Sequence, residues 1–380
     1  MFHALDKEFS TFLAKNLKLK TPFFLFSIKK IKARFKEFKK FFPKSQIHYA
    51  VKANSEPELL KVLNKAGCGF EVASKYELSL LKKMKVKPAH ILYGSSVKPI
   101  EHIREFYRYG VNKYCADSFQ ELEKIAAAAP KSKVYIRTVV SDAGSVFKFS
   151  EKFGTDLNNI VPLLLKAKEL GLTPYGISFH VGSQASNLMA WANAIGSLSF
   201  VIDELHRKGI KIEILNIGGG FPCQYASTDM VPSLKEISKT IFAQYKKLHH
   251  KPRLVLEPGR GMIADNGIAV TSVIGKVERA GGTNWLFLDA GVYNAFFEAM
   301  SYQGSTRYPI SSLRPAEAGG EKLFSLAGPT GDSPDIITKE ALLPTDIEIG
   351  DKIIAHNVGA YTLPAVSKFN GFPKPKVYFI

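Results

Sequence analysis

The sequence lacks the features that mark exported and membrane proteins. Its first ten residues, MFHALDKEFS, are charged and have no apolar core of the kind found in signal peptides. No apolar run approaches the ~18 residues that a membrane-spanning helix needs. Cysteine is scarce as well, because Cys68, Cys115 and Cys223 are odd in number, far apart and without metal-ligand spacing. We therefore expect a cytoplasmic protein with no disulfide framework, no metal site and no membrane partner.

Acidic residues are also few. The chain has 34 Asp and Glu against 52 Lys and Arg, a formal net charge of +18. One basic cluster, KKIKARFKEFKK (residues 29–40), predicts an amphipathic helix with lysines outward. The apolar residues that we expect to face inward are Ile31, Phe35, Phe38 and Phe42. A solvated lysine surface explains the charge best, and since no nucleic-acid module accompanies it, we expect no nucleic-acid partner. Attraction of an acidic substrate is compatible with the charge.

What the sequence does contain is a series of short strand-like runs, each followed by polar turn residues and a helix-like segment. The eight runs are IHYAV (47–51), GFEVAS (69–74), HILYGSS (90–96), KYCADS (113–118), KVYIRTVV (133–140), GISFHVGS (176–183), IEILNIGGG (212–220) and RLVLEPGR (253–260). Strands that alternate with helices predict parallel βαβ units, and eight of them predict a (β/α)8 barrel. We expect this α/β barrel to span residues 22–262.

The pattern changes after residue 262. The runs AVTSVIGKVERA, NWLFLDAG, EKLFSLAGP, DKIIAHNVG and KVYFI follow one another with few helical stretches between them. Such an arrangement predicts a separate, mostly antiparallel β domain over residues 263–380. We expect the N-terminal segment 1–21 to join this domain.

Polar residues gather where the predicted barrel strands end. In barrels of this kind the working residues lie at the C-terminal ends of the strands. The residues at these positions are Lys52, Glu71, Arg137, His180, Gly218, Gly219, Gly220, Glu257 and Arg260. Any one of them is explained by a strand cap or a turn, but all of them at one rim predict a functional site.

The chemistry of these residues indicates a phosphorylated ring. NIGGGFP (216–222) would let bare backbone N–H groups approach a phosphate, although a plain turn explains this motif equally well. Arg260 suits a phosphate, and Glu257 would keep a ring nitrogen protonated. FHVGSQ (179–184) adds a strand-end histidine and Ser183. Lys52 could form a Schiff base with a cofactor. A lysine of this kind, a phosphate cradle and a carboxylate suited to a ring nitrogen together suggest pyridoxal 5′-phosphate.

The same motifs carry a family resemblance. YAVKAN, FHVGSQ, NIGGGFP, EPGR, GPTGDSPD (328–335), GAYT (359–362) and FNGFPKPKVYFI (369–380) occur in this order. The sequence resembles the alanine-racemase-type (fold type III) pyridoxal phosphate decarboxylases, which act on ornithine, lysine, arginine or diaminopimelate. The last two motifs favour the ornithine decarboxylase branch. Alanine racemases share the barrel but have a different C-terminal signature.

The resemblance implies a role for each matching residue. Lys52 would hold the cofactor, His180 would stack on its ring, and Glu257 would face the pyridine nitrogen. Glu71 and Arg137 would flank the ring and the lysine nitrogen. The residues that would hold the phosphate are Ser183, Gly218, Gly219, Gly220, Arg260 and Tyr361.

The resemblance also implies a homodimer whose active sites are completed across the two-fold axis. GPTGDSPD would come from the partner subunit and would place Asp332 near the far end of the amino acid substrate. Phe369 would line the same interface. The catalytic set is then Lys52, His180, Glu257 and Asp332.

Two positions depart from the family pattern. Family members usually carry a cysteine in GPTGDSPD that assists protonation of the carbon that lost CO2, whereas this chain has Gly331. Loss of a positioned general acid typically costs ~10²–10⁴-fold in that step. In EAMSYQGSTRYPI (298–310), Gln303 occupies the place of an acidic residue that reads the distal amine of the substrate. An amide binds an ammonium less well than a carboxylate does.

These observations predict decarboxylation of a free L-diamino acid of the ornithine or lysine type, as in polyamine biosynthesis. One alternative is an N-acylated diamino acid such as N-citryl-ornithine, as in siderophore biosynthesis, because both departures alter the substrate end of the pocket. Asp332 is retained and would still bind an amine. A second alternative is a catalytically inactive regulatory homologue, although the complete cofactor set argues against it.

Overall fold

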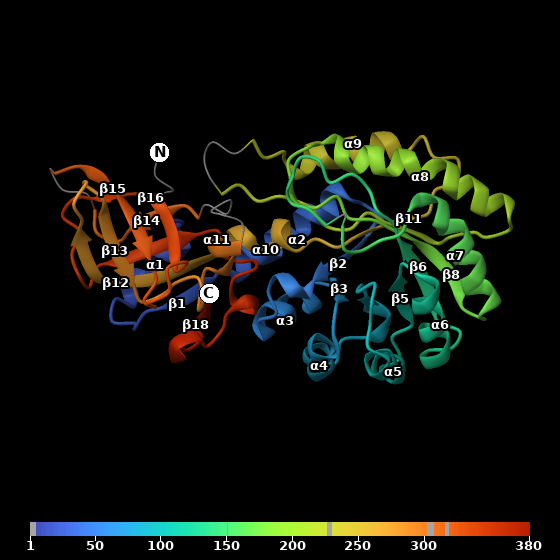
Figure 1. Cartoon of the computed structure of the whole chain (residues 1–380), viewed down its shortest axis with the longest axis horizontal. Helices are drawn as coiled ribbons and strands as arrows, with labels where there is room; N and C mark the ends of the chain where they lie inside the picture. Colours follow the sequence, from blue (N-terminus) through green and yellow to red (C-terminus); the bar gives the residue numbers. More distant parts are fainter. Residues whose placement is uncertain (1–4, 150, 226–229, 302–307, 316–318) are drawn as a thin grey trace. The chain divides into compact units, whose positions relative to one another are not determined.

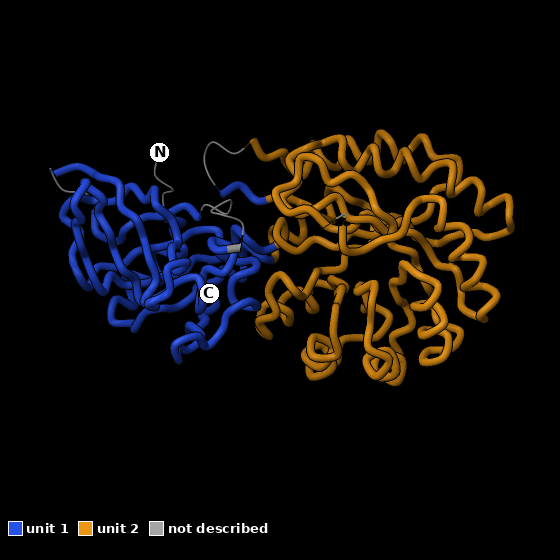
Figure 2. The backbone as a smooth tube through the Cα atoms, viewed as in Figure 1, with its two compact units in different colours: residues 1–31, 223–229, 263–380 blue, residues 32–222, 230–262 orange. Residues whose placement is uncertain are grey.

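The computed structural model describes residues 5–149, 151–225, 230–301, 308–315 and 319–380. The chain forms two compact units, shown in Figure 2. One, here called the β unit, contains Met1–Ile31, Cys223–Asp229 and Ile263–Ile380, and the other, the barrel unit, contains Lys32–Pro222 and Met230–Met262. Within the described parts of the chain, no helix combines the length and the apolar character that crossing a membrane requires.

Eight parallel strands close the barrel, which confirms the predicted fold class. In order around the barrel they are β2 (Gln46–Ala50), β3 (Gly69–Val72), β4 (Ile91–Tyr93), β5 (Lys113–Ala116), β6 (Lys133–Arg137), β8 (Thr173–Ser178), β10 (Ile214–Asn216) and β11 (Arg253–Leu256). Each predicted run contains one of these strands or overlaps it. The strands are almost fully buried because helices cover them outside and side chains fill the inside.

Helices surround the strands of the barrel unit (Figure 1). They are α2 (Ile28–Phe41), α3 (Pro57–Lys65), α4 (Lys75–Lys83), α5 (Ile100–Tyr109), α6 (Phe119–Ala128), α7 (Leu157–Glu169), α8 (Met189–Arg207), α9 (Leu234–Tyr245) and the short α10 (Arg260–Ile263). Ser74, Ser118 and Ser233 begin α4, α6 and α9, each accepting a backbone N–H from three residues on. The predicted inward face of α2 is confirmed, since Ile31, Phe35, Phe38 and Phe42 are at most 3% exposed.

The middle of the barrel is filled. Leu92, Cys115, Tyr135, Tyr175, Ile214 and Val255 form one buried cluster, contributed by six of the eight strands. A packed interior leaves no passage from one end of the barrel to the other, so polar chemistry is confined to the two rims.

The β unit is a mostly antiparallel sheet, as predicted. Its strands are β1 (Phe23–Phe26), β12 (Gly267–Glu278), β13 (Asn284–Leu288), β14 (Ile310–Ser312), β15 (Glu321–Ala327), β16 (Ile336–Pro344), β17 (Lys352–His356) and β18 (Lys376–Phe379). The main path runs β14-β17-β12-β13-β15-β16, and among the described residues of this unit only the β1–β18 and β13–β15 pairs are parallel. Two short helices, α1 (Lys7–Lys15) and α11 (Phe297–Ser301), accompany it.

Strand β1 belongs to this sheet, although the predicted barrel range begins at residue 22. It pairs with β12 on one side and β18 on the other. Phe23 and Leu25 share a buried core with Phe9 and Leu13 of α1. An all-apolar run of four residues carries no sign of which sheet it joins, and its long-range partners decide that.

Candidate active site

The Lys52 amine lies at the carboxyl rim of the barrel. Strand β2 ends at Ala50 and a single 3-10 turn, Val51–Ala53, presents the lysine. Val51 and Ala53 are fully buried, whereas the Lys52 side chain is 46% exposed. Its Nζ donates to Glu71 Oε2 at 2.6 Å. The backbone is therefore fixed by packing, and the amine is held next to a buried carboxylate but remains accessible.

Glu257 is the second carboxyl group at this rim. It follows β11, and Asn216 Nδ2 donates to its Oε1 at 2.6 Å. Burial, together with the nearby Glu71 carboxylate, raises the pKa of Glu257 to about 7, and Lys52 is one of the groups that oppose this shift. The carboxyl can therefore change protonation state near neutral pH.

Asn216 links this carboxyl to the glycine loop. The side chain is fully buried at the end of β10, and its Oδ1 accepts the backbone N–H of Gly218 at 3.0 Å. The sequence analysis did not single it out. The available signal was its place at a strand end, directly before the glycines, where a buried amide must find partners for both ends.

His180 follows β8 and is neutral. Burial, then the positive charges of Arg137 and Lys52, lower the pKa of His180 well below its usual value. Its Nδ1 accepts the N–H of Gly182 at 3.1 Å, so the proton of the neutral ring is on Nε2. The Phe149 ring meets the imidazole edge-on at 5.1 Å. A neutral, oriented imidazole is suited to lie against a flat ring.

The glycine loop after β10 has no room for side chains. Gly218 and Gly220 adopt φ of +66° and +92°. A Cβ at Gly219 would lie 2.8 Å from the carbonyl oxygen of Glu257 and 3.0 Å from His180 Nε2. Glycine at all three positions is therefore required by backbone conformation or by the close approach of neighbouring atoms. This requirement favours a phosphate-binding loop over an ordinary turn.

Arg260 and Ser183 lie next to this loop. Arg260 begins α10, is 3% exposed, and donates from Nε to Ser183 Oγ at 3.2 Å. Ser183 opens β9 (Ser183–Ala185), which pairs with β7 (Ser145–Phe147), and the N–H of Ala185 donates to the Gly220 carbonyl at 3.0 Å. These contacts bring a buried guanidinium, a hydroxyl and the glycine loop together as an anion site.

The set fits pyridoxal 5′-phosphate. An accessible lysine amine beside a carboxylate, an anion site, and a partly buried carboxyl poised near neutrality are the three groups that this cofactor uses. Arg137 ends β6 and influences both His180 and Glu257 electrostatically. The predicted rim residues of the barrel unit are thus brought together.

The remaining predicted residues lie in the β unit. The hydroxyl of Tyr293 donates to the Asp332 carboxylate, and its ring lies 4.4 Å from that of Phe369. Tyr293 thus joins two residues that are far apart in the sequence, and no motif pointed to it. Tyr361 has a φ of +55°. Gln303 lies outside the described residues.

The GPTGDSPD segment is held by its last residue. Asp335 is 2% exposed and accepts from the N–H of Val292 at 2.8 Å and from Thr330 Oγ1 at 2.6 Å. In the part of the chain that the structure describes, no atom outside its immediate chain neighbours lies within 4 Å of a Cβ built on Gly331. Packing therefore does not require glycine at this position, and a larger side chain fits there.

Comparisons with known proteins agree on one family. Residues 28–264 match the family model “Pyridoxal-dependent decarboxylase, pyridoxal binding domain”. The chain is 32% identical over 374 residues to a lysine/ornithine decarboxylase of Selenomonas ruminantium, covering 98% of this chain and 92% of that one. It is 30% identical to antizyme inhibitor 2 of Xenopus laevis, covering 94% and 80%. A Vibrio vulnificus lysine/ornithine decarboxylase complexed with putrescine matches with a TM-score of 0.89 at 29% identity, covering 99% of both chains.

Proposed function

Because this chain belongs to the pyridoxal-dependent decarboxylase family, we propose that it decarboxylates a free L-diamino acid of the ornithine or lysine type. The observation that carries the proposal is the Lys52–Glu71 ion pair, which holds an accessible amine at the rim of the barrel. The anion site and the partly buried Glu257 would supply the other two contacts of the cofactor. Relatives that act on lysine and ornithine support this substrate class.

The chain's residues divide the work of holding the cofactor. Lys52 would bind it covalently, and the glycine loop, Ser183, Arg260 and Tyr361 would hold its phosphate. When bound, the cofactor supplies a protonated pyridine ring that withdraws the electrons of the bond to the departing carboxylate. His180, neutral and oriented through Nδ1, would pack against the ring without adding positive charge.

Glu257 keeps the ring nitrogen protonated. Its Oε1 accepts from Asn216 Nδ2 at 2.6 Å, and the carboxyl group would share a proton with the ring nitrogen. A carboxyl group with a pKa near 7 ionises readily once a positive charge lies beside it, because the charge offsets the cost of burial. Asn216 holds the carboxyl in place, since a buried amide bonded at both ends cannot rotate without losing a hydrogen bond.

Substrate recognition falls to the β unit of the partner subunit in the homodimer that we propose. The Asp332 carboxylate, oriented by Tyr293, would bind the distal ammonium of the substrate, and Phe369 would pack at the same interface. An ammonium–carboxylate contact of this kind favours a free diamino acid over one acylated at its distal nitrogen. Since residue 331 is glycine, another acid or water protonates the α-carbon after CO2 leaves.

A substrate panel tests the proposal. The cofactor-loaded protein is offered ornithine, lysine, arginine, diaminopimelate and N-citryl-ornithine in parallel, and CO2 and the amine product are identified by mass. We expect release from ornithine or lysine and none from the Lys52→Ala variant. Turnover of N-citryl-ornithine alone would replace the free diamino acid with the acylated substrate and would assign Gln303 and Gly331 to a rebuilt pocket.

A second candidate is a catalytically inactive regulatory homologue. Gly331 and the similarity to antizyme inhibitor 2 favour it. The buried Arg260–Ser183 contact and the Asn216–Glu257 pair argue against it, because a protein that binds no cofactor has no need for either. Failure to release CO2 from every substrate, combined with failure to bind the cofactor, would favour the regulator.

A further inference from the structure

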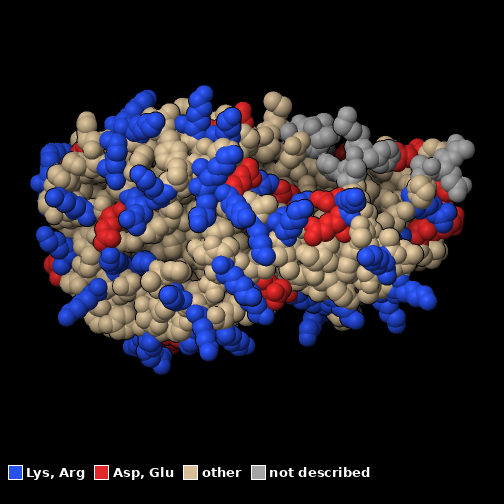
Figure 3. Space-filling model, turned by 180° about the vertical axis from the view of Figure 1, so that it is seen from behind, with Lys and Arg blue, Asp and Glu red and all other residues tan. Residues whose placement is uncertain are grey.

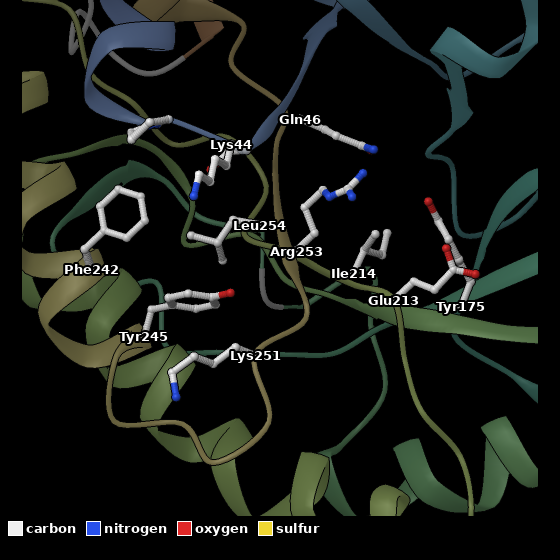
Figure 4. A pocket seen from close by; sticks show the side chains of 12 residues that line it. Lys44, Gln46, Tyr175, Glu213, Ile214, Phe242, Tyr245, Lys251, Arg253 and Leu254 are labelled. Atoms are coloured by element: carbon white, nitrogen blue, oxygen red, sulfur yellow. The ribbon is translucent and has the colours of Figure 1, made fainter.

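The opposite end of the barrel has a cavity that the decarboxylase site does not use. It is open, has a volume of about 860 Å³, and is lined by the first residues of three strands, Gln46 of β2, Ile214 of β10 and Arg253 of β11 (Figure 4). Gln46 begins β2 and Lys52 follows its end, so they lie at opposite ends of a strand that spans roughly 13 Å at the rise of an extended chain. We call this space the basal cavity.

The basal cavity is positively charged. Lys44, Lys251 and Arg253 line it, and all three are exposed. Its one carboxylate, Glu213, is neutralised by Lys133 at 2.7 Å. Among the described residues, none of the three lining cations forms an ion pair with a carboxylate.

The surrounding surface adds to this charge. Further exposed lysines follow along α2 and at the end of α9; they are Lys36, Lys39, Lys40, Lys246 and Lys247. Figure 3 shows Lys and Arg side chains, coloured blue, spread widely over the face that it draws. A concave surface lined by charges of one sign concentrates ligands of the opposite sign.

Aromatic rings line the same space. Phe242 and Tyr245 meet edge to face at 6.2 Å, and the Tyr245 hydroxyl is fixed by the Pro252 carbonyl at 3.0 Å. Figure 4 shows these two rings and Lys44 on one side of Arg253 and Tyr175 on the other. Lys251 Nζ donates to the Leu248 carbonyl at 2.6 Å, which holds this cation beside the rings. Rings held in place beside cations that have no carboxylate partner among the described residues offer a flat apolar surface next to an anion site.

We propose that the basal cavity binds a phosphorylated ring compound of the nucleoside-phosphate class. Lys44, Lys251 and Arg253 contact the phosphates, and Phe242 and Tyr245 pack against the ring. The volume is that of a typical small-molecule site. The cationic amines of diamino acid metabolism are repelled by this lining, so the cavity is not a second substrate site. The inference is independent of which amino acid the enzyme decarboxylates.

Calorimetric titration of the cofactor-loaded protein with ATP tests this inference. Inorganic tripolyphosphate supplies the charge without the ring, and adenosine supplies the ring without the charge. Two variants remove lining cations, Lys44→Gly and Arg253→Gln. Lys44 has a φ of +63°, a conformation that glycine adopts freely, so Lys44→Gly removes the charge and keeps the turn. The matched control is Lys85→Gly, because Lys85 is also exposed, has a φ of +55°, and lies outside the lining.

The inference predicts that ATP binds more tightly than either tripolyphosphate or adenosine. It also predicts that Lys44→Gly and Arg253→Gln each weaken ATP binding about fivefold, the effect of one accessible ion pair, while Lys85→Gly leaves it unchanged. Absence of ATP binding would overturn the inference. Equal affinity for tripolyphosphate, or equal weakening by Lys85→Gly, would also overturn it, because either result would show a basic surface without a built site.

Discussion

At the scale of single residues, the chemistry depends on how the chain sets the charge of Glu257. The partly buried side chain is desolvated and lies near Glu71, which favours its neutral form, but Lys52 and Asn216 favour the ionised form. These opposing effects place the pKa of Glu257 at about 7. A cofactor ring nitrogen next to the carboxyl would then determine whether the proton lies on the nitrogen or on Glu257. We infer that the partly buried Glu257 carboxyl is positioned to control the protonation of the cofactor's pyridine ring.

The first prediction concerns catalysis by Glu257. Glu257→Gln keeps the size of the side chain and its contact with Asn216 but removes the charge opposite the ring nitrogen. We expect kcat to fall by about 10²-fold or more, while the affinity for the cofactor changes little because the anion site is untouched. Turnover and cofactor affinity measured on the same preparation check this. A variant with the wild-type kcat would refute the role assigned to Glu257.

The second prediction concerns the stability of the cofactor-free protein. Between the ordinary pKa of 4.5 and about 7, the folded chain keeps a proton on Glu257 that the unfolded chain has lost. Stability contributed by this group is therefore lost as pH rises through that interval. We expect the Tm of Glu257→Gln, relative to the wild type, to increase from pH 5 to pH 7.5. Other titrating groups, such as Glu77 and His180, are common to both proteins and cancel in the difference. A constant Tm difference would contradict the raised pKa.

At the scale of elements, the strand ends and the glycine loop assemble the site. Lys52, Glu71, Glu257 and Arg137 come from different strands and meet because parallel strands end at one rim. This part could be predicted from the sequence, since strand-like runs and the polar residues that follow them are local patterns. Asn216 and Tyr293 were missed because their importance lies in the partners Glu257 and Asp332, which are distant in the sequence.

The third prediction tests the loop. Gly219→Ala would place a methyl group 2.8 Å from the Glu257 carbonyl and 3.0 Å from His180, so we expect cofactor affinity to fall about tenfold or more. The control is Gly209→Ala. Gly209 has a φ of +76°, and among the described residues no atom outside its chain neighbours lies within 4 Å of the added Cβ. That change costs about 1 kcal/mol of stability through backbone strain and leaves cofactor affinity unchanged. Cofactor titrations and thermal melts separate the two effects. Wild-type affinity in Gly219→Ala would show that the loop is only a turn.

At the scale of the whole molecule, the proposal requires two chains for each active site. Lys52 belongs to the barrel unit, and Asp332 belongs to the β unit. The sequence indicated both units and the strand order along the chain, but β1 joined the β unit through pairings that no local pattern encodes. The association of two chains depends on the shape and chemistry of their surfaces, which the hydrophobic periodicity of the sequence does not predict.

The fourth prediction tests this association. Lys52→Ala and Asp332→Ala are each expected to be inactive, but a mixture allowed to exchange subunits should regain roughly a quarter of the wild-type activity. Random exchange gives about half mixed dimers, each with one intact site of two. Sedimentation of the wild type serves as the control for dimer formation. Dimers that exchange without regaining activity would show that each site is built from a single chain.

The central claim is that Lys52, among many lysines, is the cofactor residue. Lys98 is the instructive competitor, because it is fully buried but its Nζ already forms an ion pair with Glu121 at 2.7 Å and donates to the carbonyls of Ser95 and Cys115. The most direct measurement is therefore to incubate the protein with pyridoxal 5′-phosphate, reduce the linkage with borohydride, digest the protein, and map the labelled peptide by mass spectrometry. The account predicts a single stoichiometric label on Lys52. A label on Lys98, or labels spread over the surface lysines, would contradict it.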